Sequence, residues 1–130
     1  MTTLALAAAI VAALIHVLVF CLESLWFHHP RVYRRFQVNS AEELAATRAF
    51  AFNQGFYNLF LALGAFVGVM LVAAGPVTMD TAGRVLLTFV CASMAGAGLV
   101  LLATDRRMIR AALIQAVPPA SALLALGLAG

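Results

Sequence analysis

The sequence contains no lysine, only five acidic residues and two cysteines, and each shortage excludes a class of protein. Charged residues make up 10% of the 130 positions, whereas a soluble domain carries about a quarter, so a soluble globular fold is excluded. The eight arginines lie beside hydrophobic runs, which favours a role in membrane topology and excludes nucleic acid as a partner. Cys21 and Cys91 both lie in apolar segments, where we expect buried thiols without a disulfide.

Several catalytic motifs are also missing from the sequence. There is no pattern for a covalent nucleophile, no glycine-rich phosphate loop and no redox pair of cysteines. One histidine and one glutamate seven positions apart, His16 and Glu23, are too few ligands for a zinc site. We therefore expect neither a metal nor a cofactor.

Long hydrophobic runs are what the sequence has in abundance. Hydrophobic residues make up 65% of the chain and the mean hydropathy is +1.04, which indicates an integral membrane protein. Four runs have about the 20 residues that a helix needs to cross a bilayer. They predict an all-α, four-transmembrane-helix bundle in a single domain of residues 1–130, with spans at about 4–27, 49–74, 84–104 and 108–128.

The second helix carries signals at both of its ends and on one face. Ser40 followed by Glu43 is typical of a capping box, so the helix should begin there, lie first in the interface and cross at about 49–74. Gly64 and Gly68 form a small-xxx-small pair that lets another helix approach closely. We expect this face to meet the first helix, and it also offers a surface for a homo-oligomer.

Orientation in the membrane follows from the positions of the arginines. The first and third connectors carry almost all of them, and four spans place these two connectors on one side. The positive-inside rule makes that side cytoplasmic, with both termini outside the cytoplasm and the protein in a bacterial inner membrane. The arginines on this side are Arg31, Arg34, Arg35, Arg48, Arg106, Arg107 and Arg110, and Arg84 is on the other.

The run Asn53-Gln54-Gly55-Phe56-Tyr57-Asn58 interrupts the second span with hydrogen-bonding side chains. Such side chains must find partners inside a membrane protein. At about 1.5 Å per residue, Glu23 lies roughly 6 Å and His16 roughly 16 Å inside the first span. Antiparallel counting then places Asn53 level with Glu23 and Asn58 close to His16.

These depths predict a polar pocket in the cytoplasmic half of the bundle. Pro118 and Pro119 should kink the fourth helix and leave the carbonyls of Ile114 and Gln115 without helical donors, close to this pocket. Glu23 and His16 are the candidate proton-transfer residues. The candidate ligand-binding residues are Asn53, Gln54, Tyr57, Asn58, Gln115, Trp26 and Ser93. Each of these candidate residues also has a purely structural interpretation. The polar side chains can join neighbouring helices by hydrogen bonds, and Trp26 can anchor the first span at the membrane interface.

Four segments together resemble one known family. They are His16 with Glu23-Ser24-Leu25-Trp26, the run from Asn53 to Ala62, Cys91 to Gly96, and Gln115 to Pro118. The chain resembles the small bacterial and fungal membrane proteins grouped as domain of unknown function 1304, over nearly its whole length. The family pattern has glycine where Leu59 stands and one proline where this chain has two. The resemblance implies a four-span membrane protein and brings no activity with it.

Three functions are consistent with these residues. The first is acid–base chemistry on a lipophilic small molecule, with Glu23 and His16 transferring protons. The second is binding or transport of a lipophile or small solute in the same pocket. The third is a bundle held together by polar contacts that stabilises another membrane protein. Membrane lipid and a lipophilic ligand are the expected partners.

Overall fold

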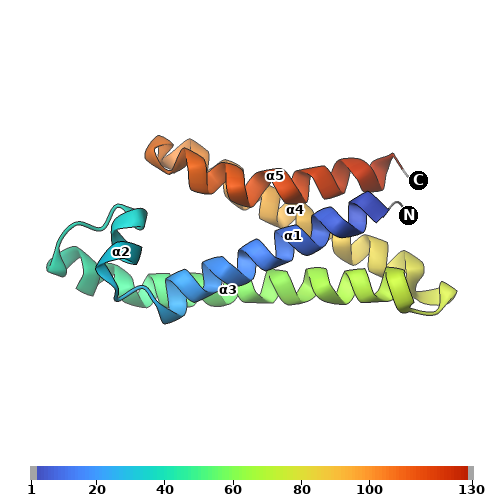
Figure 1. The fold of residues 1–130 in the computed structure, drawn as a ribbon, viewed down its shortest axis with the longest axis horizontal. Coiled ribbons are helices and arrows are strands. Elements are labelled where there is room, and N and C mark those ends of the chain that lie inside the picture. Colours follow the sequence, from blue (N-terminus) through green and yellow to red (C-terminus); the bar gives the residue numbers. More distant parts are fainter. Residues whose placement is uncertain (1–2, 129–130) are drawn as a thin grey trace.

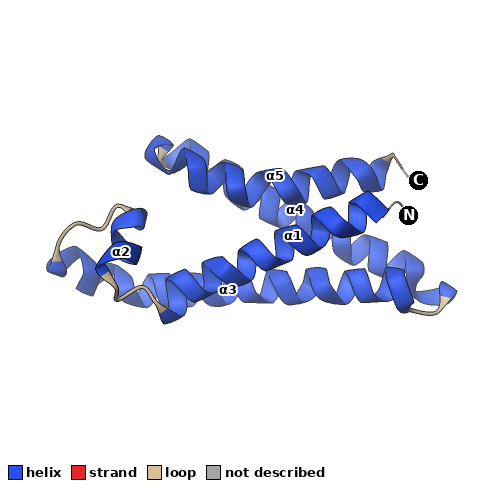
Figure 2. Ribbon diagram, in the orientation of Figure 1, coloured by secondary structure: helices blue, strands red, loops and turns tan. Residues whose placement is uncertain are grey.

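Residues 3–128, the part of the chain that the computed structural model describes, are almost entirely helical and contain no strand (Figure 2). The helices are α1 (Thr3–Phe20), α2 (Pro30–Tyr33), α3 (Ala41–Ala74), α4 (Asp80–Thr104) and α5 (Ile109–Gly127). A π-helical turn (Cys21–Leu25) extends α1, and 3-10 turns occupy Arg34–Phe36, Val77–Met79 and Arg106–Met108.

Four of the helical segments are long and apolar enough to cross a membrane. They are Thr3–Leu25, Ala41–Ala74, Val77–Thr104 and Arg106–Gly127. The prediction of an all-α bundle of four membrane-spanning helices is therefore confirmed, and the chain is a multi-pass membrane protein.

The four long helices form a ring. α1 packs on α3 and α5, α4 packs on the same two helices, and α1 and α4 touch only slightly. Figure 1 shows the α2 connector and the α4–α5 turn at one end of the bundle, opposite the α3–α4 connector. We call this the arginine end, because it carries seven of the eight arginines (Arg31, Arg34, Arg35, Arg48, Arg106, Arg107 and Arg110).

Small side chains form much of the core. Ala5, Ala9, Ala12 and Ala13 of α1 are all fully buried, and Leu87 and Met94 of α4 are the largest fully buried apolar side chains among the described residues. A hydrophobic driving force between helices is absent in lipid, so association depends on close van der Waals packing, which small residues permit.

Gly64 and Gly68 lie against α4, and the expectation that their face meets the first helix is wrong. A Cβ atom on Gly68 would lie 2.7 Å from the Cγ atom of Leu87, and one on Gly64 would lie 2.9 Å from a methyl carbon of Val90. The surface proposed for a homo-oligomer is thus covered by α4 of the same chain. α3 instead turns a neighbouring face, which includes Asn58, toward α1.

The N-terminal segment of α3 extends beyond the span, as expected from its capping box. Glu43 N–H donates to the Ser40 hydroxyl at 3.1 Å, and the Glu43 carboxylate accepts from the Asn39 backbone N–H at 2.7 Å. The 34 residues of α3 would reach about 51 Å, compared with about 30 Å for the hydrocarbon core. The first turns of α3 therefore lie outside the hydrocarbon core.

α5 contains both prolines and continues as one helix through them. Figure 1 shows α5 changing direction near its middle. Pro118 and Pro119 account for a change of direction there, because proline lacks an N–H and crowds the preceding turn.

The connector between α1 and α3 folds back against the arginine end. Pro30 is the first residue of α2, so it begins a short helix, and the π-helical turn has already ended at Leu25. The rings of Phe27 and Phe36 lie 5.5 Å apart, and both Phe27 and Val38 are buried. This packing holds the 3-10 turn Arg34–Phe36 close to the bundle.

Candidate functional site

The π-helical turn at the end of the first span positions Glu23 and Ser24. Its defining hydrogen bond runs from the Trp26 N–H to the Cys21 carbonyl, five residues back, at 2.9 Å. A π-helical turn takes one more residue than an α-helical turn, so it rotates the side chains that follow it, and such turns are frequent at functional sites.

Gly55 lets α3 approach this turn closely. A Cβ atom there would clash with the Ser24 hydroxyl oxygen and lie 3.1 Å from both the Ser24 backbone nitrogen and the Glu23 Cβ atom. The Ser24 hydroxyl donates to the Phe52 carbonyl of α3 at 2.8 Å. The glycine therefore fixes the position of α3 relative to the first span.

Glu23 and Asn58 form a polar pair between the first span and α3. The Asn58 side-chain amide donates to the Glu23 carboxylate at 2.9 Å and to the Gln54 carbonyl at 3.2 Å. Asn58 is 6% exposed, and Glu23 is partly buried. Asn58, and not Asn53, is level with Glu23, so the predicted alignment of the two helices was wrong by about one and a half turns.

His16 lies apart from this pair. It is fully buried, and its Nδ1–H donates to the Ala12 carbonyl at 2.9 Å, because a carbonyl can only accept. In the neutral imidazole Nε2 is then an acceptor, and it has no hydrogen-bond partner among the described residues. The expected proximity of Asn58 to His16 is wrong, because Asn58 pairs with Glu23, seven residues away along the first span.

The other predicted site residues do not gather around Glu23. Asn53, Gln54 and Tyr57 lie on the exposed side of α3, and Trp26 is also exposed. The hydroxyl of Ser93 donates to the Phe89 carbonyl of its own helix at 2.9 Å. The structure thus brings Glu23 and Asn58 together, and it leaves these side chains outside that contact.

Gln115 lines a separate cavity of about 540 Å³ between α1 and α5 at the arginine end. Its side-chain amide makes no hydrogen bond to any residue within 3–128. Most of the wall is apolar. The lining residues are Ile15, Leu18, Val19, Leu22, Arg35, Phe36, Arg107, Met108, Arg110, Ala111, Ile114 and Gln115.

The two prolines of α5 lie one turn beyond two residues that line this cavity. Pro118 and Pro119 have no N–H, so the carbonyls of Ile114 and Gln115 lack their donors four residues along the helix. Both residues line the cavity. Freed backbone acceptors at membrane depth are tolerated where they lie inside protein or line a cavity.

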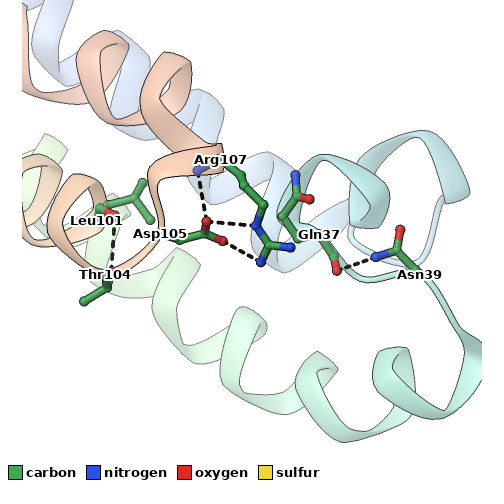
Figure 3. Close-up of polar contacts among 6 residues, drawn as sticks. All are labelled: Gln37, Asn39, Leu101, Thr104, Asp105 and Arg107. Carbon is green, nitrogen blue, oxygen red and sulfur yellow. Dashed lines mark hydrogen bonds and ion pairs between the residues drawn. The ribbon is translucent and has the colours of Figure 1, made fainter.

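An ion pair holds the α4–α5 turn at the mouth of the cavity. Two nitrogens of the Arg107 guanidinium donate to the two carboxylate oxygens of Asp105 at 3.0 Å each (Figure 3). The Arg107 backbone N–H also donates to Asp105, at 3.0 Å. These bonds hold the pKa of the Asp105 carboxyl below its usual range. Asp105 is thus ionised at neutral pH and offsets much of the Arg107 charge.

No group of three or more metal-ligating side chains occurs within residues 3–128. A second, smaller cavity of about 320 Å³ lies at the opposite end of the bundle, beside Arg84. Arg84 pairs there with Asp80 at 2.7 Å.

A family match covers the residues of both the polar pair and the larger cavity. A model of the family described as "Protein of unknown function (DUF1304)" matches residues 10–127. The chain belongs to this family. No curated protein and no solved structure matches it. The resemblance seen in the sequence is therefore confirmed, and the DUF1304 match includes Glu23, Asn58 and every residue that lines the larger cavity.

The sequence of this DUF1304 protein did not lead us to predict that arginines line the cavity. Arg35, Arg107 and Arg110 were used only for topology, although they flank apolar positions that the structure places in the same cavity. The available signal was that Arg110 lies four residues before Ile114, just beyond the α4–α5 turn, so the two side chains share a helix face. Arg35 gave no such signal, because its position depends on how the connector folds.

Proposed function

We propose that this protein binds a lipophilic small molecule within the membrane, in the cavity between α1 and α5. The observation that carries the proposal is the cavity itself, a hollow lined by residues of α1, α5, the connector and the α4–α5 turn. Its volume of about 540 Å³ lies within the ~300–1,000 Å³ typical of small-molecule sites. A mostly apolar wall with a few polar groups is also typical of such sites.

Gln115 and the two freed carbonyls are the groups that would orient the ligand. The side-chain amide of Gln115 has donors and an acceptor without partners among the described residues, and it lines the cavity. A ligand with a hydroxyl, carbonyl or amide group satisfies them. Binding is favoured over a purely structural role, because a scaffold has no need of this space.

Native mass spectrometry of the protein released from its own membrane tests this proposal. The Ala111→Phe variant places a ring in the cavity, so it should lose the small-molecule adduct that the wild-type protein carries. Ala103→Phe is the matched control, because Ala103 is exposed on α4 outside the cavity. Equal adducts in wild type and Ala111→Phe, or none in either, would contradict the proposal.

Acid–base chemistry on the bound molecule is the second candidate function. It is supported by an ionisable carboxylate inside a span, at a π-helical turn: Glu23 directly follows Leu22, which lines the cavity, and the Glu23 side chain itself pairs with Asn58 of α3. The Glu23→Gln variant keeps a hydrogen-bond acceptor for Asn58 but removes the ionisable group. The molecules bound to this variant should therefore be substrate alone, whereas those bound to the wild-type protein should include product. An identical adduct in both proteins would contradict this second function.

The arrangement in the membrane is part of the proposal. We propose that the arginine end faces the cytoplasm of a bacterial cell and that both termini lie outside it, in the inner membrane. The distribution of seven arginines against one supports this orientation. Reporter proteins fused after the fourth span test this orientation, because they would lie outside the cytoplasm. An alkaline phosphatase should be active there, and a green fluorescent protein should be dark. The reverse pattern would contradict the orientation.

A further inference from the structure

The cavity between α1 and α5 is charged at the arginine end and mostly apolar along its length, and it has a neutral polar group, Gln115, at its far end. Arg35, Arg107 and Arg110 contribute from the connector, the α4–α5 turn and the first turn of α5, all at the arginine end. Ile15 and Gln115 are the lining residues farthest from the arginine end. Along the helix axes, Ile15 is about 10 Å from Leu22 and Gln115 is about 7.5 Å from Arg110. This polarity fits a molecule with a charged head and a mostly apolar chain, on which a neutral polar group can bond to Gln115.

The cations at the mouth differ in how far their charge is compensated. Arg107 makes a bidentate pair with Asp105. Arg35 and Arg110 have no ion-pair partner among residues 3–128. The arginine beside the smaller cavity, Arg84, is also paired, with Asp80. Uncompensated guanidinium groups thus line the larger cavity and not the smaller one.

The volume of the cavity limits the size of the tail. One water molecule occupies about 30 Å³ in the liquid, so 540 Å³ corresponds to roughly 18 water-sized units. One long acyl chain has about this number of carbon atoms. Two such chains would need about twice this volume.

We propose that the ligand is a single-chain amphiphile with an anionic headgroup, a carboxylate or a phosphate, bound by Arg35 and Arg110. This inference rests on the proposed function of the same cavity. Planar guanidinium groups donate in pairs to carboxylate and phosphate oxygens, and such charge-assisted bonds are about twice as strong as neutral ones. The headgroup then lies at the membrane interface and the chain points into the bilayer, the direction that a leaflet gives any amphiphile.

Titration of the delipidated protein with three probes of matched chain length tests the headgroup. The probes are oleate, oleoyl lysophosphatidate and the neutral monoolein, and binding is followed by native mass spectrometry. At least one anionic probe should bind about tenfold or more tightly than monoolein. The preferred anion distinguishes a carboxylate from a phosphate.

Two double variants with the same net charge test the role of the named arginines. Arg35→Gln/Arg110→Gln should lose most of the preference for the anionic probe, about tenfold or more in affinity. Arg34→Gln/Arg106→Gln removes the adjacent arginines, which do not line the cavity, and should keep the preference. Thermal melting of both variants in detergent reports whether they remain folded, and single Arg35→Gln and Arg110→Gln variants replace the double if it unfolds.

The outcomes separate this inference from the proposed function. Equal binding of all three probes, blocked by Ala111→Phe, would overturn the anionic headgroup and leave lipophile binding intact. An equal loss in both double variants would also overturn the inference, because it would indicate general attraction to a basic surface. No binding of any probe, together with no adduct from the native membrane, would overturn both.

Discussion

At the scale of single residues, the contact between Asn58 and Glu23 is the main polar connection between the first span and α3. One amide group of Asn58 donates both to the carboxylate and to the Gln54 carbonyl. Residue type was sufficient to select Glu23 and Asn58 from the sequence, because polar side chains inside an apolar run need partners. Their pairing was not predictable from depth alone, since it depends on the alignment of the two helices.

Replacing Asn58 with leucine should destabilise the bundle by about 1–3 kcal/mol, because it leaves the partly buried Glu23 carboxylate without its donor. Thermal unfolding in detergent measures the effect. Asn53→Leu is the control and should change stability by less than about 0.5 kcal/mol, because Asn53 is exposed. If the Glu23→Met/Asn58→Leu double variant is not more stable than Asn58→Leu alone, the unpaired carboxylate is not the cause.

Gln115 should matter for binding and not for folding. Its amide lines the cavity and makes no hydrogen bond to another described residue. Gln115→Leu should therefore weaken binding of the lipophile about two- to tenfold, the range for one neutral hydrogen bond. The melting temperature should be unchanged. A fall in melting temperature with unchanged affinity would make Gln115 a structural residue.

At the scale of elements, the π-helical turn and Gly55 together set how the first span meets α3. The four spans and the capping box of α3 were predictable, because hydrophobic runs and the Ser40–Glu43 pattern are local signals. The alignment of the helices was not, because one extra residue in a helical turn and one close contact at a glycine leave no periodic pattern. The same limit applies to Gly64 and Gly68, since a small-xxx-small pair predicts close packing without naming the partner helix.

Gly55→Ala should destabilise the bundle by about 1–3 kcal/mol, because its Cβ atom has no room beside Ser24. Gly96→Ala is the matched control on α4, where nothing lies within 4 Å of the new Cβ atom. Alanine should be neutral or stabilising there, by up to about 1 kcal/mol. Unfolding in detergent compares the two variants.

The nearest atom to the new methyl group is the Ser24 hydroxyl oxygen. Ser24→Ala/Gly55→Ala should therefore recover part of the loss, although the Ser24 backbone nitrogen remains 3.1 Å away. Equal stability of Gly55→Ala and Gly96→Ala would contradict the close contact at Gly55.

At the scale of the whole molecule, composition was sufficient to predict the class of protein, whereas the proposed site depends on how the four helices pack in a ring. A membrane bundle of four helices was predictable, because a chain with 10% charged residues and four apolar runs has no soluble alternative. The cavity was not predictable, because its wall combines α1, α5 and a connector that folds back through Phe27 and Phe36. The site that we propose therefore lies between α1 and α5 and not in the predicted pocket around Glu23.

Photo-crosslinking in the intact membrane tests the location of the ligand most directly. A fatty acid with a diazirine in the middle of its chain is added to membranes that contain the protein, and the labelled peptides are mapped after irradiation. Adducts should concentrate on residues 15–22 and 108–115 and should disappear in Ala111→Phe. Adducts distributed over the exposed faces of α3 and α4, unchanged by Ala111→Phe, would contradict a binding site between α1 and α5.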